Sequence, residues 1–104
     1  MTDHRIAGAG HMPQGETRHA DLDDLPVCLV RVDDGSFFAV HDVCSHEETP
    51  LSDGWVYDCK IECSLHGAVF DLQTGDAVSL PATEPIPTYP VRRDGDDLVV
   101  TVAD

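Results

Sequence analysis

Two short pairs of cysteine and histidine stand near the middle of the chain. The first pair is Cys44 and His46, the second is Cys63 and His66, and residues 47–62 separate them. Cysteine sulfur and histidine nitrogen are ligands that proteins use for zinc and for iron. Two loops that each carry one thiol and one imidazole can close around a single metal centre, so the spacing indicates a metal site.

The same four ligands could hold a structural zinc ion in tetrahedral geometry. Zinc sites more often combine C-x-x-C with H-x(3–5)-H pairs, and the C-x-H and C-x-x-H pairs of this chain differ from that spacing. A structural zinc module therefore remains an alternative, which a colourless protein would reveal. The sequence shows no nucleophile–base arrangement and no phosphate-binding glycine loop, so it gives no sign of an enzyme.

The residues around the two pairs fit the motifs of one family, and they are Pro50-Leu51, Gly54, Gly67, Phe70-Asp71, Thr74-Gly75 and Leu80-Pro81-Ala82. Over residues 27–102 the sequence resembles the Rieske iron–sulfur proteins, whose second ligand pair continues as H-G-x-x-F-D-x-x-T-G before a proline loop. In a Rieske [2Fe–2S] cluster, two histidines replace two cysteines on one of the irons. The resemblance thus favours iron over zinc.

The resemblance implies one [2Fe–2S] cluster, with Cys44 and Cys63 on the inner iron and His46 and His66 on the outer iron. It implies a soluble ferredoxin, an electron-transfer protein without catalysis of its own. Such ferredoxins carry one electron from a flavin-dependent ferredoxin reductase to the terminal non-haem iron oxygenase of an aromatic-ring dioxygenase. Similar small Rieske proteins are associated with iron–sulfur cluster assembly systems, so an electron carrier for such a system is the alternative. Cys59 has no place in the family motif and is not expected to be a ligand.

The resemblance also bears on the reduction potential of the cluster. High-potential Rieske proteins have a disulfide at positions that hold Thr49 and Leu65 in this chain, and hydroxyl-bearing residues at the positions of Ala68 and Phe70. Hydrogen bonds to the sulfur atoms stabilise the more negative reduced cluster. Without these hydroxyls, we expect a potential at the low end of the Rieske range, roughly −150 mV.

Length and charge limit the partners. The 104 residues suffice for one domain, 1–104, and the formal net charge of −14 disfavours nucleic acid and anionic membranes as partners. The same charge could steer the protein toward a basic surface on a redox partner. No secretory signal, membrane-spanning run or long apolar stripe is visible, so we expect a cytoplasmic monomer.

The elements that would position the ligands are short strands separated by turns. Residues 26–32 and 36–41 predict a hairpin through Asp33-Asp34-Gly35, and further strands are expected at residues 4–7, 16–22, 54–57, 60–62, 68–72, 88–93 and 98–102. No helical period is evident. We therefore expect an all-β Rieske fold, with an antiparallel sandwich or barrel as base and a small cluster-binding subdomain of two hairpin loops at about residues 43–82.

Four other side chains need an interpretation. Cys28 and Cys59 lie in apolar, strand-like contexts and are expected to be core residues or half-buried thiols. Trp55 and Tyr57 lie on an expected strand, where aromatic residues are more often core than part of an electron path. The remaining histidines, among them His19, lack the spacing of ligands and are expected to be surface or core residues.

Overall fold

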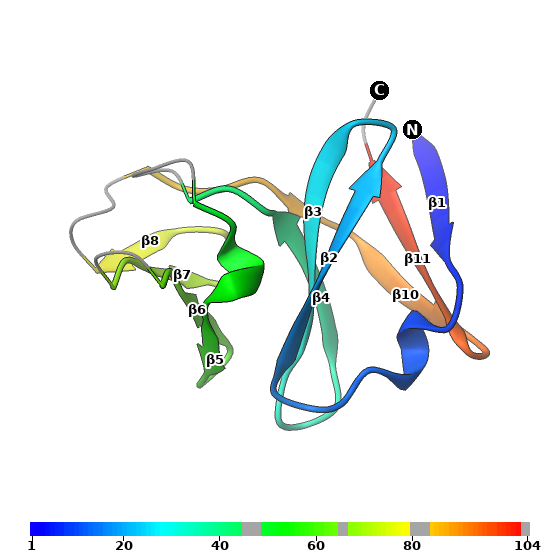
Figure 1. The fold of residues 1–104 in the computed structure, drawn as a ribbon, viewed down its shortest axis with the longest axis horizontal. Coiled ribbons are helices and arrows are strands. Elements are labelled where there is room, and N and C mark those ends of the chain that lie inside the picture. Colours follow the sequence, from blue (N-terminus) through cyan, green and yellow to red (C-terminus); the bar gives the residue numbers. More distant parts are fainter. Residues whose placement is uncertain (45–48, 65–66, 80–83, 103–104) are drawn as a thin grey trace.

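The computed structural model describes residues 1–44, 49–64, 67–79 and 84–102. Strands account for most of the ordered elements, with two short 3-10 turns, η1 and η2 (Figure 1). In chain order the elements are β1 (Thr2–Ile6), η1 (Ala9–His11), β2 (Glu16–Leu22), β3 (Leu25–Arg31), β4 (Phe37–His41), η2 (Leu51–Asp53), β5 (Trp55–Tyr57), β6 (Lys60–Glu62), β7 (Val69–Asp71), β8 (Ala77–Ser79), β9 (Thr88–Tyr89), β10 (Val91–Asp94) and β11 (Asp97–Val102).

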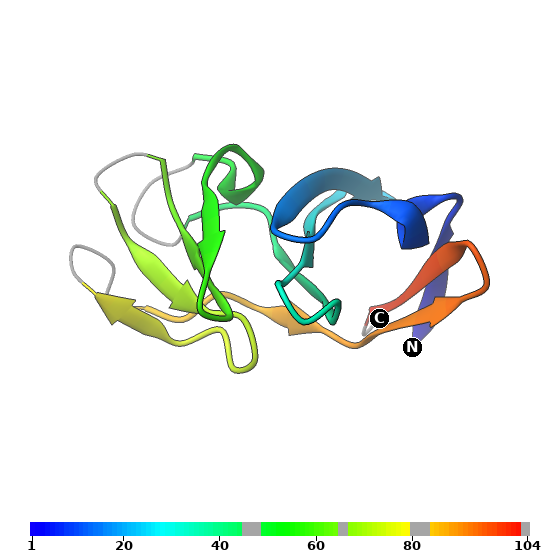
Figure 2. The same ribbon diagram turned by 90° about the horizontal axis from the view of Figure 1, so that it is seen from below.

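The strands form three antiparallel sheets, in the orders β1-β11-β10, β2-β3-β4-β9 and β5-β6-β7-β8. The first two sheets face each other and make up the base of the molecule, while the β5–β8 sheet lies beside the base (Figures 1 and 2). The predicted all-β fold class is confirmed. Within the described ranges, no helix has the length and apolar character needed to cross a membrane.

Strand β3 lies between two hydrophobic cores and contributes to both. Because successive side chains of a strand point to opposite faces, Val27 and Leu29 enter one core and Cys28 and Val30 enter the other. The first core fills the base, with Leu98 and Val100 among its members. The second core joins the base to the β5–β8 sheet and includes Cys44, Leu51, Ile61, Cys63, Ala68, Phe70 and Leu72.

Most of the expected strands are present, with two differences. The predicted hairpin of residues 26–32 and 36–41 is confirmed as β3 and β4, with Gly35 at a φ of 90° in its turn. The single strand expected over residues 88–93 is wrong, because Pro90 has no N–H to donate and separates β9 in one sheet from β10 in another. The structure also contains a strand that the sequence did not predict, β8, because Ala77, Val78 and Ser79 show no alternation of apolar and polar residues.

Two glycines let backbone segments approach closely beside the second core. A Cβ on Gly54 would lie 1.9 Å from the carbonyl oxygen of Glu62, and a Cβ on Gly75 would lie 2.1 Å from that of Ile86. Gly75 also has a φ of 81°, which side chains disfavour. The N–H of Ile86 donates to the carbonyl oxygen of Gly75 at 2.8 Å, which fastens the chain that returns to the base.

Candidate metal centre

The two cysteines of the predicted centre lie at the ends of strands and in the same core. Cys44 comes shortly after β4 and is 3% exposed, while Cys63 comes directly after β6 and is 0% exposed. The N–H of Cys44 donates to the carbonyl oxygen of Thr49 at 3.0 Å, and the N–H of Cys63 donates to that of Ala68 at 2.7 Å. Each hydrogen bond closes a loop that begins at a cysteine.

The histidines predicted as the other two ligands, His46 and His66, lie outside the described residues. The four-residue ligand set therefore stays a prediction. Among the described residues, no group of three or more His, Cys, Asp or Glu is arranged to hold a metal ion. The described residues include two of the four predicted ligands, Cys44 and Cys63.

The donor chemistry of the two cysteines suits an iron–sulfur cluster. None of the four cysteines forms a disulfide, and Cys44 and Cys63 lie within one apolar core with Leu51 and Phe70. A thiolate is a soft ligand that holds iron in such clusters, and an apolar shell limits access of water to a cluster. These two side chains fit the inner, cysteine-ligated iron of a Rieske centre.

The other two cysteines have different surroundings. Cys28 lies on β3, where burial raises the pKa of its thiol and favours the protonated form, as expected for a core residue. Cys59 lies in the turn between β5 and β6 with a φ of 58°, which differs from the strand-like setting expected. Its thiol is half-buried, and its pKa is raised first by desolvation. Neither thiol is poised to form a thiolate.

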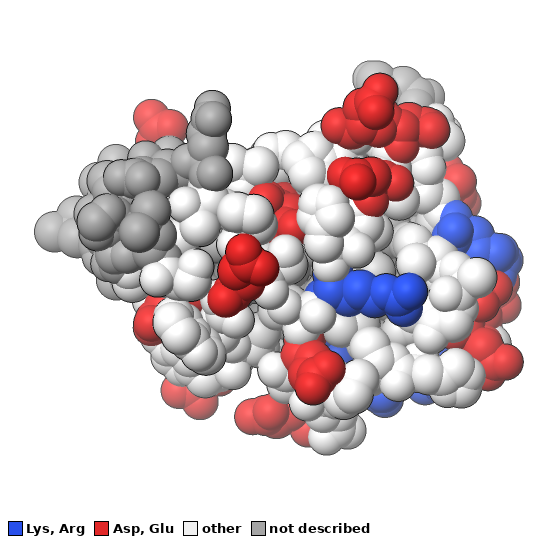
Figure 3. Space-filling model, viewed as in Figure 1, with Lys and Arg blue, Asp and Glu red and all other residues white. Residues whose placement is uncertain are grey.

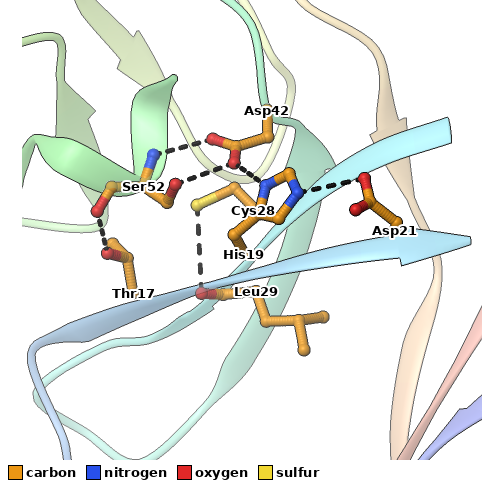
Figure 4. Close-up of polar contacts among 7 residues, drawn as sticks. All are labelled: Thr17, His19, Asp21, Cys28, Leu29, Asp42 and Ser52. Atoms are coloured by element: carbon orange, nitrogen blue, oxygen red, sulfur yellow. Dashed lines mark hydrogen bonds and ion pairs between the residues drawn. The ribbon is translucent and has the colours of Figure 1, made fainter. Parts of the chain in front are cut away.

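A buried carboxylate fastens the first ligand loop to the base, and no pattern in the sequence pointed to it. Asp42 comes two residues before Cys44 and is 2% exposed. Its Oδ1 accepts the N–H of Ser52 at 2.7 Å, and its Oδ2 accepts the hydroxyl of Ser52 at 2.7 Å (Figure 4). The hydroxyl of Thr17 on β2 donates to the carbonyl oxygen of Ser52 at 2.6 Å. Ser52 in η2 is thus held from both sides.

His19 on β2 completes this network. Its Nδ1 bonds to Oδ2 of Asp42, and its Nε2 lies 3.0 Å from Oδ1 of Asp21 (Figure 4). The pKa of His19 is raised, first by the hydrogen bond to Asp42 and further by the one to Asp21, against an opposing desolvation. His19 is therefore a partner of a buried acid, which the spacing of histidines in the sequence could not indicate.

The raised pKa of His19 predicts a pH-dependent contribution to stability. The interaction is fully present below the unfolded-state value of 6.5 and is lost as the pH rises through the higher folded-state value. We expect the difference in unfolding free energy between the wild type and His19→Gln to shrink as the pH rises above 6.5 and through the higher folded-state pKa. The change should stay below about 1 kcal/mol, because solvent screens the half-exposed ring. Chemical denaturation of both proteins at several pH values measures the difference in unfolding free energy. A difference that stays constant with pH would contradict the prediction.

The aromatic residues of β5 are not where they were expected. Trp55 is 57% exposed and Tyr57 is 41% exposed, so the expectation that both are core residues is wrong. Val56 between them packs against the second core. The three-residue strand lies at the edge of its sheet, and only its middle residue faces inward.

Similarity to known proteins identifies the family. The profile of the Rieske [2Fe–2S] domain matches residues 3–90. The chain is 41% identical over 90 residues to the 3-phenylpropionate/cinnamic acid dioxygenase ferredoxin subunit of Escherichia coli strain K12, and the match covers 86% of this chain and 83% of that protein.

Two solved structures agree with this match. The ferredoxin of carbazole 1,9a-dioxygenase from Nocardioides aromaticivorans IC177 superposes with a TM-score of 0.88 and 34% identity, covering 96% of this chain and 97% of that chain. A chain in a complex of reduced oxygenase and oxidized ferredoxin of carbazole 1,9a-dioxygenase gives a TM-score of 0.84 and 31% identity, covering 93% and 99%. Sequence and fold agree, and the chain belongs to the Rieske [2Fe–2S] family, whose cofactor is one [2Fe–2S] cluster.

Proposed function

We propose that this protein is a Rieske-type ferredoxin that carries single electrons to the terminal non-haem iron oxygenase of an aromatic-ring dioxygenase. The observation that carries the proposal is the 41% identity to a dioxygenase ferredoxin subunit over most of both chains. A related ferredoxin has been solved in complex with its oxygenase, which supports the oxygenase as acceptor. The donor is a flavin-dependent ferredoxin reductase, as in the systems that the sequence resembles.

The cluster would be held by Cys44 and Cys63 as thiolates on the inner iron and by His46 and His66 on the outer iron. The burial of both cysteines in one core supports the first half of this assignment. When bound, the cluster supplies a centre that accepts and releases one electron. The chain's own contribution is to close each loop through the N–H of its cysteine and to exclude water with apolar neighbours.

The proposal includes one domain, 1–104, in which residues of about 43–82 form the cluster-binding subdomain. The separate β5–β8 sheet, which lies within that range, supports this division. We also propose a cytoplasmic monomer. Cys28 and Cys59, which are not among the proposed ligands, form no disulfide, as is usual in a reducing compartment.

Reconstitution tests the proposed function. The purified protein, reduced with dithionite, should give the rhombic EPR signal of mixed histidine and cysteine ligation and a low potential. It should then support product formation when combined with a flavin reductase and the oxygenase component of the E. coli relative or of carbazole 1,9a-dioxygenase. A colourless protein that holds zinc would contradict the cluster. An intact cluster that sustains turnover of neither oxygenase would contradict the role as oxygenase donor.

The Ala68→Ser variant should raise the reduction potential. Ala68 is fully buried in the second core and stands where high-potential Rieske proteins carry a serine. A new hydrogen bond to the cluster would favour the reduced state by about 1 kcal/mol, which is roughly 40 mV at about 59 mV per tenfold change. A redox titration measures the shift, with Ala20→Ser on β2 as control. An unchanged potential with the cluster intact would contradict the expectation.

A further inference from the structure

Two aromatic side chains are exposed on the outer face of the β5–β8 sheet. Trp55 and Tyr57 are 57% and 41% exposed and point to the same side of β5, with the inward Val56 between them. Strand β5 is an edge strand, paired only with β6 within its sheet. Exposed aromatic residues on a small protein often mark a surface that contacts a partner, because aromatic rings are enriched in protein interfaces.

A carboxylate is fixed beside these rings. Glu62 on β6 is the register partner of Trp55, and the hydroxyl of Tyr57 donates to Oε1 of Glu62 at 2.9 Å. This hydrogen bond is the first cause of the raised pKa of Tyr57, so the phenol stays a donor at neutral pH. The ammonium of Lys60 turns instead to the carbonyl oxygen of Asp58 at 3.3 Å. Among the described residues, Glu62 has no cation as partner.

An indole face next to an oriented carboxylate is suited to a guanidinium group. The ring attracts the cation through its quadrupole, and the carboxylate can accept two of its N–H groups. Arginine makes both contacts better than lysine, because its planar group stacks on rings and pairs with carboxylates in a fork. The surface formed by Trp55, Tyr57 and Glu62, which we call the Trp55 face, therefore suits an arginine of a partner.

The charge of the whole molecule favours a basic partner at this end. The chain has a formal net charge of −14, and Lys60 is its only lysine or arginine between residues 43 and 82. The arginines lie on the base strands, namely Arg5, Arg18, Arg31, Arg92 and Arg93. On the side of the molecule seen in Figure 3, the blue surface gathers over the base and none lies over the β5–β8 sheet. Such a field steers and orients a positively charged partner.

The Trp55 face adjoins the candidate centre through the backbone. Glu62 directly precedes Cys63, and Trp55 directly follows Gly54, where a Cβ would meet the carbonyl oxygen of Glu62 at 1.9 Å. A partner seated on this face therefore lies next to the strand end that carries one of the proposed ligands. That location suits electron transfer, which needs a short path from the centre to the partner.

We propose that the Trp55 face is a docking surface for an arginine-bearing, basic surface of the terminal oxygenase. The inference rests on the proposed function and adds where on this chain the acceptor binds. A solved relative forms a complex with its oxygenase, which supports the oxygenase as the occupant of this face. The reductase then uses a different surface or does not depend on these three side chains.

Rapid mixing of reduced ferredoxin with oxidised oxygenase tests the proposal, using the oxygenase component that gives product with the wild type in the reconstitution. The dependence of the transfer rate on oxygenase concentration gives an apparent dissociation constant. We expect Trp55→Ala to raise this constant about tenfold, as for an interface anchor. Glu62→Gln should raise the apparent dissociation constant several-fold and make this constant less dependent on salt concentration. The matched controls Glu16→Gln on β2 and Val78→Ala, an exposed apolar residue on β8, should behave as the wild type.

Two further measurements separate docking from damage to the centre. The EPR signal and potential of both test variants should equal those of the wild type, and their reduction by the flavin reductase should be unchanged. Wild-type transfer to the oxygenase by both variants would overturn the proposal. Slower reduction by the reductase, with normal transfer to the oxygenase, would also overturn it and assign the face to the reductase. Failure of the wild type with both oxygenases would instead overturn the proposed function itself.

Discussion

Replacing Cys44 or Cys63 by serine is expected to abolish the cluster. Each side chain is almost fully buried in the core that the two ligand loops share, and a serine hydroxyl is a much poorer ligand of cluster iron than a thiolate. We expect purified Cys44→Ser and Cys63→Ser to be colourless and to contain only a few per cent of the iron that the wild type contains. Absorption spectra and iron analysis measure the loss, and reconstituted electron transfer should fall to background.

Cys59→Ser is the matched control, because Cys59 is half-buried in a turn and is not expected to be a ligand. This variant should keep its full iron content and EPR signal. A coloured, iron-replete Cys44→Ser or Cys63→Ser protein would disprove the ligand assignment. A colourless Cys59→Ser protein would show that this third cysteine is also needed to hold the cluster.

Removal of the Asp42 carboxylate is expected to destabilise the protein by about 3 kcal/mol. Asp42→Ala leaves the N–H and hydroxyl of Ser52 and the ring of His19 without their buried acceptor. Asp42→Asn keeps one carbonyl oxygen as acceptor, so its cost should be smaller, about 1–2 kcal/mol. Chemical denaturation measures both variants, and the rate at which iron is lost to a chelator should rise in the same order.

The exposed Asp96→Ala variant, in the turn between β10 and β11, serves as the control for loss of a carboxylate. Its cost should lie within about 0.5 kcal/mol of zero, as is usual at the surface. Equal stabilities of Asp42→Ala and Asp96→Ala would contradict the structural role of the network. Ser52→Ala offers an independent check, because it removes one of the two hydrogen bonds that join Ser52 to Asp42 and leaves the acid in place.

The strands of the base could be predicted because their patterns are local. The predicted strand of residues 16–22 has the bounds of β2, and the paired runs before and after Gly35 form the central hairpin. The hairpin follows from its β-branched residues and a turn glycine. The three-residue strand β8 could not be predicted in this way, since it depends on β7 as a partner rather than on its own sequence.

In the candidate site, too, local features could be predicted from the sequence, and features that depend on the whole fold could not. Cys44 and Cys63 are predictable from type and spacing, and the structure buries both in one core. The burial of Asp42 is not predictable, because an acidic residue after a strand is usually exposed and its partners come from β2 and η2. The exposure of Trp55 escapes prediction for a related reason, since a strand's position at the edge of a sheet is a property of the whole fold.

Both faces of β3 are buried, each in a different core, so the base is not an independent module. Its Cys28 and Val30, with Val40 of β4, face the core that the β5–β8 sheet covers. Excision of residues 43–82 would expose this apolar surface to water, and the remaining base would be prone to self-association. By the same logic, amide protons of β3 should exchange with deuterium only when the entire molecule opens, which makes this strand the natural reporter of global unfolding.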